Sequence, residues 1–346
     1  MNALAPYLEI FLREYLPRDR RVSTHTIETY AYAFQLLVCF AAKRLRVAPS
    51  ALQIEQLDAA LILAFLEHIE TQRHNLPQTR NARLGAVKAF FRFLEYRLPG
   101  SLDQICRIKA IPIKITDQAL VHYLTPAEMQ ALLDAPDSRT RSGTRDRAML
   151  HLAFAAGLRV SELIGLRRDE LVLHPHPSVR VRGKGRRERE LPLWKETAAV
   201  LRTWVTARGE NPAPELFLNS CGEPMTRSGF EYILAKHVES ATKKQPSIAR
   251  KRVSPHVLRH TCAMHTLLAT HDVRKVSLWL GHASLQSTEI YLRADPTEKL
   301  EALAAVMPPT VKRGHFKAPD RLLDMLKSAN KAPRYAQRRT VDVPRK

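Results

Sequence analysis

Cysteine is scarce in this sequence, and its placement excludes two common means of stabilising a fold. The 346 residues include four cysteines (Cys39, Cys106, Cys221 and Cys262), which lie far apart and form no Cys-x-x-Cys pair. The pattern indicates neither a zinc site nor a disulfide framework, and it fits a reducing compartment.

Long apolar segments are missing as well. No apolar run approaches about 18 residues, so we expect no membrane-spanning helix. Residues 1–16 carry Glu9, Arg13 and Glu14 among their apolar residues and lack the layout of a signal peptide. We therefore expect a cytoplasmic protein.

Acidic residues are few relative to basic ones. There are 34 Asp and Glu against 55 Lys and Arg, which gives a formal net charge of +21. Such a field favours a polyanion, with nucleic acid ahead of an anionic membrane surface, although a basic structural protein would share it. No carboxylate cluster of the D-x-D or D-D-E kind is present to hold two magnesium ions, which speaks against a two-metal transposase or nuclease.

The length predicts two domains of ordinary size. Residues 1–108 show apolar positions at helical spacing and predict a helical domain, whose helix after Ser23 or Thr24 begins at a capping residue. Residues 109–123 lack a helical period and predict a linker. A second domain, residues 124–306, then begins with a capping box of Thr125, Pro126 and Glu128. Residues 307–346 are proline-punctuated and basic, and predict a partly disordered extension.

One segment of the second domain predicts a helix, a glycine break and a second helix over residues 145–166. Gly157 has the place of a left-handed C-terminal cap. Arg159 follows at the start of the next helix, where free backbone N–H groups can bind phosphate. Glu162 lies one turn on and can orient the guanidinium, although such a pair taken alone indicates a surface ion pair.

Further along, residues 179–182 and 189–193 flank Gly183-Lys184-Gly185 and predict a β-hairpin with Lys184 at its turn. A lysine in a turn is by itself an ordinary solubilising residue. Its glycine neighbours and its position between two predicted strands also allow a mobile tip that reaches into a DNA groove.

The segment Ser254-Pro255 predicts the start of a helix. His256 and Arg259 are three residues apart, so we expect both on one face of the opening turn, with His260 pointing elsewhere. Positive groups at a helix N-terminus are unfavourable unless an anion is present, which indicates a bound phosphate.

A further predicted helix, residues 273–280, ends at Gly281, and His282 follows directly. Tyr291 lies in a short helix that begins near Ser287 or Thr288. A tyrosine between apolar neighbours is most often part of a core, so this residue alone does not indicate chemistry.

Together and in this order, these motifs resemble the tyrosine recombinase (phage integrase) family, including the Xer-type recombinases. The resemblance extends from about residue 20 to residue 306 and includes Thr26-x-x-x-Tyr30 and Thr79-Arg80-Asn81. It implies a mainly α fold with a small β-hairpin or sheet, arranged as a two-domain clamp around duplex DNA. A helical core-binding domain would contact DNA through Thr79, Arg80 and Arg83, and a mixed α/β domain would carry out catalysis.

The resemblance also implies a chemistry that needs neither metal nor cofactor. Tyr291 would attack a phosphodiester to give a 3′-phosphotyrosine, with Lys184 as general acid and His256 as general base, or His260 in its place if the geometry departs from that of the family. Arg159, Arg259 and His282 would stabilise the negative charge on phosphorus. The partners implied are double-stranded DNA with specific half-sites and three further copies of the chain, as a tetramer on two sites at the nucleoid.

The resemblance implies integration, excision or transposition of a mobile element. Two alternatives share its chemistry, a type IB topoisomerase and a telomere resolvase. A DNA-binding regulator without catalysis and a basic architectural protein are alternatives of another class.

The predicted DNA contacts lead to a first test. Arg83→Glu is expected to weaken binding to the half-site, because it replaces a phosphate-binding cation by an anion. A gel-shift titration measures the change, and an unchanged affinity would refute the assignment.

Overall fold

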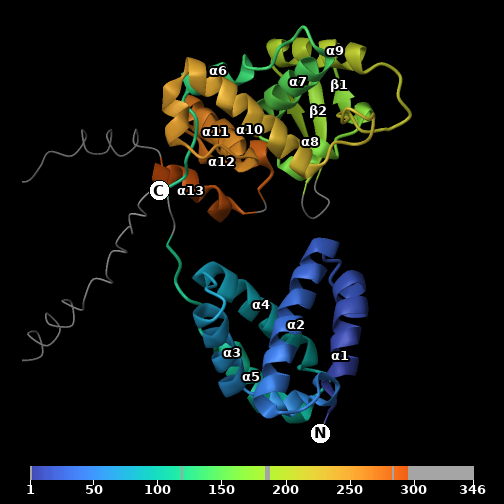
Figure 1. Cartoon of the computed structure of the whole chain (residues 1–346), viewed down its shortest axis with the longest axis vertical. Helices are drawn as coiled ribbons and strands as arrows, with labels where there is room; N and C mark the ends of the chain where they lie inside the picture. The colour runs from blue at the N-terminus through green and yellow to red at the C-terminus, as the bar shows by residue number, and fades with distance from the viewer. Residues whose placement is uncertain (1, 118–119, 184–187, 283, 295–346) are drawn as a thin grey trace, which may run out of the picture. The chain divides into compact units, whose positions relative to one another are not determined.

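The structure is a computed structural model that describes residues 2–117, 120–183, 188–282 and 284–294. Two compact units divide the chain, residues 1–119 and residues 120–346, each with its own hydrophobic core. Both units are mainly helical, and the second contains a small antiparallel sheet (Figure 1). The predicted fold class is confirmed in this respect.

The first unit is all helical. Its helices are α1 (Leu4–Ile10) with its π-helical continuation η1 (Phe11–Asp19), α2 (Thr24–Leu45), α3 (Ala59–Thr71), α4 (Pro77–Leu94) and α5 (Leu102–Ala110). Three short 3-10 turns connect them: η2 (Pro49–Ala51), η3 (Ile54–Gln56) and η4 (Pro99–Ser101). Ser23 caps α2 as predicted, because its side chain accepts a hydrogen bond from the Thr26 N–H.

An aromatic cluster holds the first unit together. Phe11, on η1, is fully buried and lies at its centre. Five rings from η1, α2 and α4 have centroids between 5.3 and 6.3 Å from that of Phe11: Tyr15, Tyr30, Phe34, Phe90 and Phe93. Edge-on and offset aromatic pairs add to the apolar burial, so the first helix is fixed against α2 and α4.

The segment that follows α5 is attached to α4. The guanidinium of Arg80 donates to the carbonyl of Pro112 at 2.9 Å. Asn81 and Lys114 exchange two hydrogen bonds, of 2.8 and 3.0 Å, between the amide side chain and the backbone. The first part of the predicted linker, residues 109–123, is therefore bound to the helical unit.

The second unit combines helices with a three-stranded sheet. Its helices are α6 (Pro126–Leu133), α7 (Arg141–Ala155), α8 (Val160–Ile164), α9 (Lys195–Arg208), α10 (Arg227–Lys244), α11 (Pro255–Thr270), α12 (Val273–Leu280) and α13 (Glu289–Ala294). Short 3-10 turns are η5 (Arg168–Glu170), η7 (Pro246–Arg250) and η8 (Leu285–Ser287). The strands β1 (Leu171–Val172), β2 (Ser178–Arg182) and β3 (Glu188–Pro192) pair antiparallel in that order.

The predicted hairpin is confirmed in its two strands, which pair Val179 with Leu191 across β2 and β3. Its turn, with Lys184, lies outside the described residues. Strand β1 was not predicted, because two residues are too few to show a period. Residues 295–346, which include the end of the second predicted domain and the extension 307–346, also lie outside the described residues.

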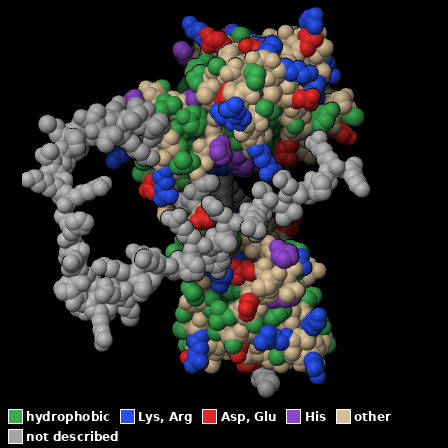
Figure 2. Space-filling model, turned by 60° about the vertical axis from the view of Figure 1, so that its left-hand side comes forward, with side chains coloured by type: hydrophobic (Ala, Val, Ile, Leu, Met, Phe, Trp, Pro, Cys, Tyr) green, Lys and Arg blue, Asp and Glu red, His purple; other side chains and the backbone are tan. Residues whose placement is uncertain are grey.

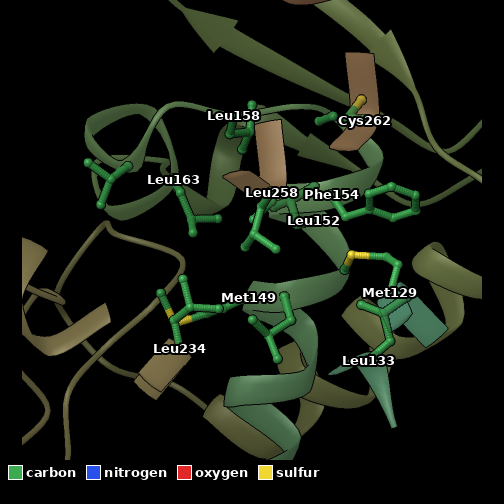
Figure 3. Packing of buried hydrophobic residues seen from close by; sticks show 14 of the residues in the cluster. Met129, Leu133, Met149, Leu152, Phe154, Leu158, Leu163, Leu234, Leu258 and Cys262 are labelled. Atoms are coloured by element: carbon green, nitrogen blue, oxygen red, sulfur yellow. The ribbon is translucent and has the colours of Figure 1, made fainter. Parts of the chain in front are cut away.

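The core of the second unit is apolar and includes side chains from the C-terminal half of α7. Met149 and Leu152 of α7 lie among apolar residues of neighbouring helices, among them Leu163, Leu234 and Leu258 (Figure 3). Close packing of these side chains fixes the ends of α7, α8 and α11 relative to one another. These ends carry the candidate site residues.

Several local predictions are confirmed by the backbone. Thr125 forms the capping box at the start of α6, and Gly157 and Gly281 have φ of +57° and +63° where α7 and α12 end. The basic segment after α10 includes η7, residues 246–250, with Ile248 buried. Within the described residues, none of the helices combines the length and apolarity that a membrane crossing needs.

The aromatic cluster predicts a stability change. Phe11→Ala is expected to lower the free energy of unfolding of the first unit by about 3–5 kcal/mol, because it leaves a cavity at the centre of the cluster. Urea denaturation measures this loss. Tyr96→Ala is the control, since that side chain is 69% exposed, and its effect is expected to stay within about 1 kcal/mol. Equal losses in the two variants would contradict the central role of Phe11.

Candidate functional site

The turn between α7 and α8 positions the first candidate arginine. Arg159 is the residue before α8, and its backbone N–H donates to Glu162 Oε2 at 3.0 Å. Its Nη1 donates to Glu162 Oε1 at 2.7 Å. The Glu162 side chain is 4% exposed and that of Arg159 is 30% exposed. The carboxylate therefore orients a guanidinium that remains open to solvent, as the sequence predicted for this pair.

Arg259 reaches the same carboxylate from α11. Its Nη1 donates to the carbonyl of Gly157 at 2.6 Å and its Nη2 to that of Leu280 at 2.8 Å. Nη1 also lies 4.0 Å from Glu162 Oε2. Burial lowers the pKa of Arg259 to about 10, so the group still carries its charge at neutral pH. The structure thus brings the two predicted arginines together.

A third guanidinium, which was not predicted from the sequence, completes this cluster. Arg189, on β3, donates to Glu162 Oε2 at 2.9 Å and its side chain is 11% exposed. Burial acts to raise the pKa of Glu162, but the hydrogen bonds and charges of Arg189 and Arg159 hold it below its usual value. Strand alternation was the available signal, because Arg189 lies two residues before the buried Leu191.

Tyr291 is buried, but it lies among polar groups. The residue is 1% exposed, and its hydroxyl lies 3.0 Å from Nδ1 of His260. Its ring is stacked on that of His282, with centroids 6.4 Å apart and planes 7° from parallel. Burial raises the pKa of the Tyr291 phenol to about 12, against the opposing effect of the Arg259 and Arg159 charges.

His282 is held beside this phenol by Thr288. Nδ1 of His282 lies 2.8 Å from the Thr288 hydroxyl, and the Thr288 carbonyl accepts the backbone N–H of Tyr291 at 3.0 Å. Burial, with the charges of Arg259 and Arg159, lowers the pKa of His282 to about 4. The imidazole is therefore neutral at pH 7 and retains one N–H donor.

The expectation that His260 points away from the site is wrong. His260 contacts the Tyr291 hydroxyl, whereas His256 is exposed on the first turn of α11. Within the described residues His256 makes no hydrogen bond or ion pair. Residues four apart lie on nearly the same face of a helix, so His260 lies near the side of α11 that carries His256.

The residues predicted to contact DNA lie on α4 of the first unit. Thr79 is exposed, and the guanidinium of Arg83 lies over the ring of Tyr32, 4.8 Å from its centroid. Arg80 is 4% exposed and donates to Pro112, so its guanidinium is engaged within the unit. DNA contact by these residues stays a prediction. Lys and Arg side chains are spread over the surface of both units (Figure 2).

Metal ligation finds no support in the described part of the chain. There, no group of three or more His, Cys, Asp or Glu is placed to hold an ion. The four cysteines are free thiols, and Cys262 is the buried one.

Two family descriptions match the chain. That of the phage integrase family matches residues 122–298, and that of the N-terminal SAM-like domain of phage integrases matches residues 9–97. A protein of Sinorhizobium fredii named as an integrase/recombinase, y4rC, is 43% identical over 326 residues, 94% of this chain and 98% of its own. The tyrosine recombinase XerC of Myxococcus xanthus is 33% identical over 302 residues, 84% of this chain and 94% of its own.

Solved structures share the fold. XerH recombinase bound to palindromic difH substrate, in a post-cleavage complex, matches with a TM-score of 0.61 and 22% identity, over 85% of this chain and 83% of that one. The Tn1549 transposon integrase in complex with circular intermediate DNA matches with a TM-score of 0.64 and 18% identity, over 88% of this chain and 99% of that one.

The turn before Arg159 predicts a second stability change. Gly157→Ala would place a Cβ 2.6 Å from Leu280 Cδ2 and 3.1 Å from Cys262 Sγ, at a φ of +57°. Gly85→Ala is the control, because Gly85 lies within α4 and its Cβ would meet open space. Gly157→Ala should lose about 1–2 kcal/mol through left-handed strain and about 1–3 kcal/mol more through overpacking, whereas Gly85→Ala should not destabilise the protein, because alanine favours a helix interior by about 1 kcal/mol over glycine. Melting temperatures that fall equally would contradict this packing.

Proposed function

The chain belongs to the phage integrase family and is a tyrosine-type site-specific recombinase, and we propose that it breaks DNA through a covalent bond between Tyr291 and a 3′-phosphate. The resemblance recognised in the sequence is thereby confirmed at the level of the family. The finer steps of the reaction follow from the residues at the site.

One observation carries this proposal: the shared surroundings of Tyr291 and the arginines. Glu162 orients Arg159 and lies beside Arg259, while Arg259 is hydrogen-bonded to Leu280 at the end of α12, two residues before His282. Tyr291 is stacked on His282. Residues from four separate helices and their connections thus form one positively charged cluster around a phenol, which suits an anionic phosphodiester.

The phenol needs help to act as a nucleophile. An unperturbed tyrosine requires about 4 kcal/mol to ionise at pH 7. With its pKa raised to about 12, Tyr291 requires about 7 kcal/mol. Free tyrosinate is therefore rare, and the proton must leave as the bond to phosphorus forms.

Hydrogen-bond donors held in place by the fold stabilise the negative charge that develops on phosphorus. We assign this role to Arg159 and Arg259, whose guanidiniums offer forked N–H groups, and to the neutral imidazole of His282. By analogy with other oxyanion donors, each contributes roughly 3 kcal/mol to the transition state. His256, exposed at the start of α11, is available to the same phosphate, and Lys184 is assigned to protonate the departing 5′-oxygen.

The products of the step are a 3′-phosphotyrosine and a free 5′-hydroxyl. The bond between Tyr291 and phosphorus replaces the phosphoester bond that breaks, so the bond energy is retained. The 5′-hydroxyl of a partner strand can therefore reverse the step without ATP. We propose that four copies on two DNA sites exchange strands in this way, in pairs and through a Holliday junction.

We place this exchange in the integration, excision or transposition of a mobile element. The relative y4rC, named as an integrase/recombinase, supports this choice. Sequencing the DNA beside the gene tests it: inverted repeats or neighbouring mobile-element genes are expected, and a chromosomal dimer-resolution site without them would contradict it.

The nucleophile leads to the main prediction. Tyr291→Phe is expected to abolish covalent trapping on a nicked suicide substrate while DNA binding is retained, because the variant lacks only the attacking oxygen. Denaturing gels measure the adduct and gel shifts measure the binding.

Tyr232→Phe serves as the control, since that side chain is 72% exposed on α10, and it should form adduct at the unaltered rate. Adduct formation by Tyr291→Phe, or none by the unmodified protein, would contradict the proposed function and favour a non-catalytic DNA-binding protein.

A further inference from the structure

We propose that His260 is a further catalytic residue, which takes the proton from the Tyr291 hydroxyl as that oxygen bonds to phosphorus. This inference rests on the proposed function, because it assigns the base for the attack by Tyr291. It departs from the resemblance, which gives that role to His256.

The contact between the two side chains is direct. Nδ1 of His260 lies 3.0 Å from the Tyr291 hydroxyl oxygen, within the range required of a general base. The rings meet edge to face, with centroids 5.7 Å apart and planes at 62°. Tyr291 is 1% exposed, so the hydroxyl has an imidazole beside it in a place where water has little access.

His260 has the protonation state that an acceptor needs. Burial, with the nearby His256 and Arg259, lowers its pKa to about 4, so the imidazole is neutral at pH 7. A neutral imidazole has one nitrogen with a free lone pair, and with the proton on Nε2 that lone pair is on Nδ1. The phenol O–H can then donate to Nδ1 before the reaction begins.

A weakly basic imidazole is sufficient if proton transfer accompanies bond formation. A phenol oxygen that is bonding to phosphorus becomes far more acidic than free phenol, so a neutral imidazole can accept its proton. The negative charge of a bound phosphodiester beside His260 would also favour the imidazolium. Arg259, one residue earlier on α11, would hold that charge near the histidine.

The position of His256 fits a different role. It lies on the exposed first turn of α11, four residues before His260, and within the described residues it makes no hydrogen bond. It is therefore free to donate to a phosphate oxygen. Both histidines thus serve one reaction: His256 at the phosphate and His260 at the nucleophile.

The step balances as the transfer of one phosphoryl group and of two protons, one at each end. The bond from the Tyr291 oxygen to phosphorus forms, and the bond from phosphorus to the 5′-oxygen breaks. The phenol proton passes to Nδ1 of His260, and the 5′-oxygen leaves as a hydroxyl with a proton from the general acid. In rejoining, the His260 imidazolium returns its proton to the departing phenolate.

The experiment uses His260→Asn together with fluorinated tyrosine at position 291 in the full chain. Asparagine can place an amide oxygen near Nδ1 and keep the hydrogen bond, but it cannot take the proton. His260→Asn is expected to slow single-turnover adduct formation on a nicked suicide substrate by about 10²–10⁴-fold with DNA binding retained. Because fluorination makes the phenol more acidic, it should raise the rate of His260→Asn by a larger factor than it raises that of the otherwise unmodified protein.

Two variants serve as matched comparisons. His256→Asn is expected to slow the reaction without recovery on fluorination, because it loses a phosphate contact. His271→Asn, at the exposed C-terminal end of α11, should react at the unaltered rate. In His260→Ala, added imidazole should restore part of the rate, which also shows that the variant is folded.

Three outcomes would overturn the assignment. They are an unaltered rate in His260→Asn, a loss that neither fluorination nor imidazole reverses, and recovery by fluorination in His256→Asn instead. A separate outcome, no adduct with the unmodified protein, would refute the proposed function itself.

Discussion

The carboxylate of Glu162 is the group on which the arrangement of the site depends. Arg159 and Arg189 donate hydrogen bonds to it, and Arg259 lies 4.0 Å away. Three guanidiniums this close would repel one another, and a carboxylate buried without partners would be strongly unfavourable. The carboxylate and the three guanidiniums therefore stabilise one another in their charged forms. Because the three arginines come from the start of α8, from β3 and from α11, this network fixes three elements relative to one another.

The cluster carries more positive than negative charge, and a bound anion would neutralise this excess. Three guanidiniums face a single carboxylate, while His260 and His282 are neutral at pH 7 because burial lowers their pKa values to about 4. Arg259 joins this cluster to the nucleophile, since it donates to the carbonyl of Leu280 at the end of α12. A phosphodiester placed there would meet forked donors on one side and the phenol on the other.

The sequence was informative where structure is set by neighbours along the chain. The capping box at Thr125, the left-handed Gly157 and the helix end at Gly281 were predicted from local chemistry and are confirmed. Contacts between distant residues were harder to predict: Arg189 lies 27 residues from Glu162, and His260 lies 31 residues from Tyr291. Periodicity held part of this information, because strand alternation turns Arg189 inward and i, i+4 spacing places His260 near the face of His256. Periodicity does not identify the distant residue that a side chain contacts, however, and the resemblance assigned no role to His260.

The central claim is that the guanidiniums ordered by Glu162 and the phenol of Tyr291 converge on one phosphorus atom. The most direct measurement is a crystal structure of the protein on a nicked DNA site with vanadate, which imitates the five-coordinate phosphorus of the transition state. The account predicts vanadium bonded to the Tyr291 oxygen, with Arg159 and Arg259 both donating to its equatorial oxygens. Vanadate bound without Tyr291, or contacted by only one of the two arginines, would contradict it.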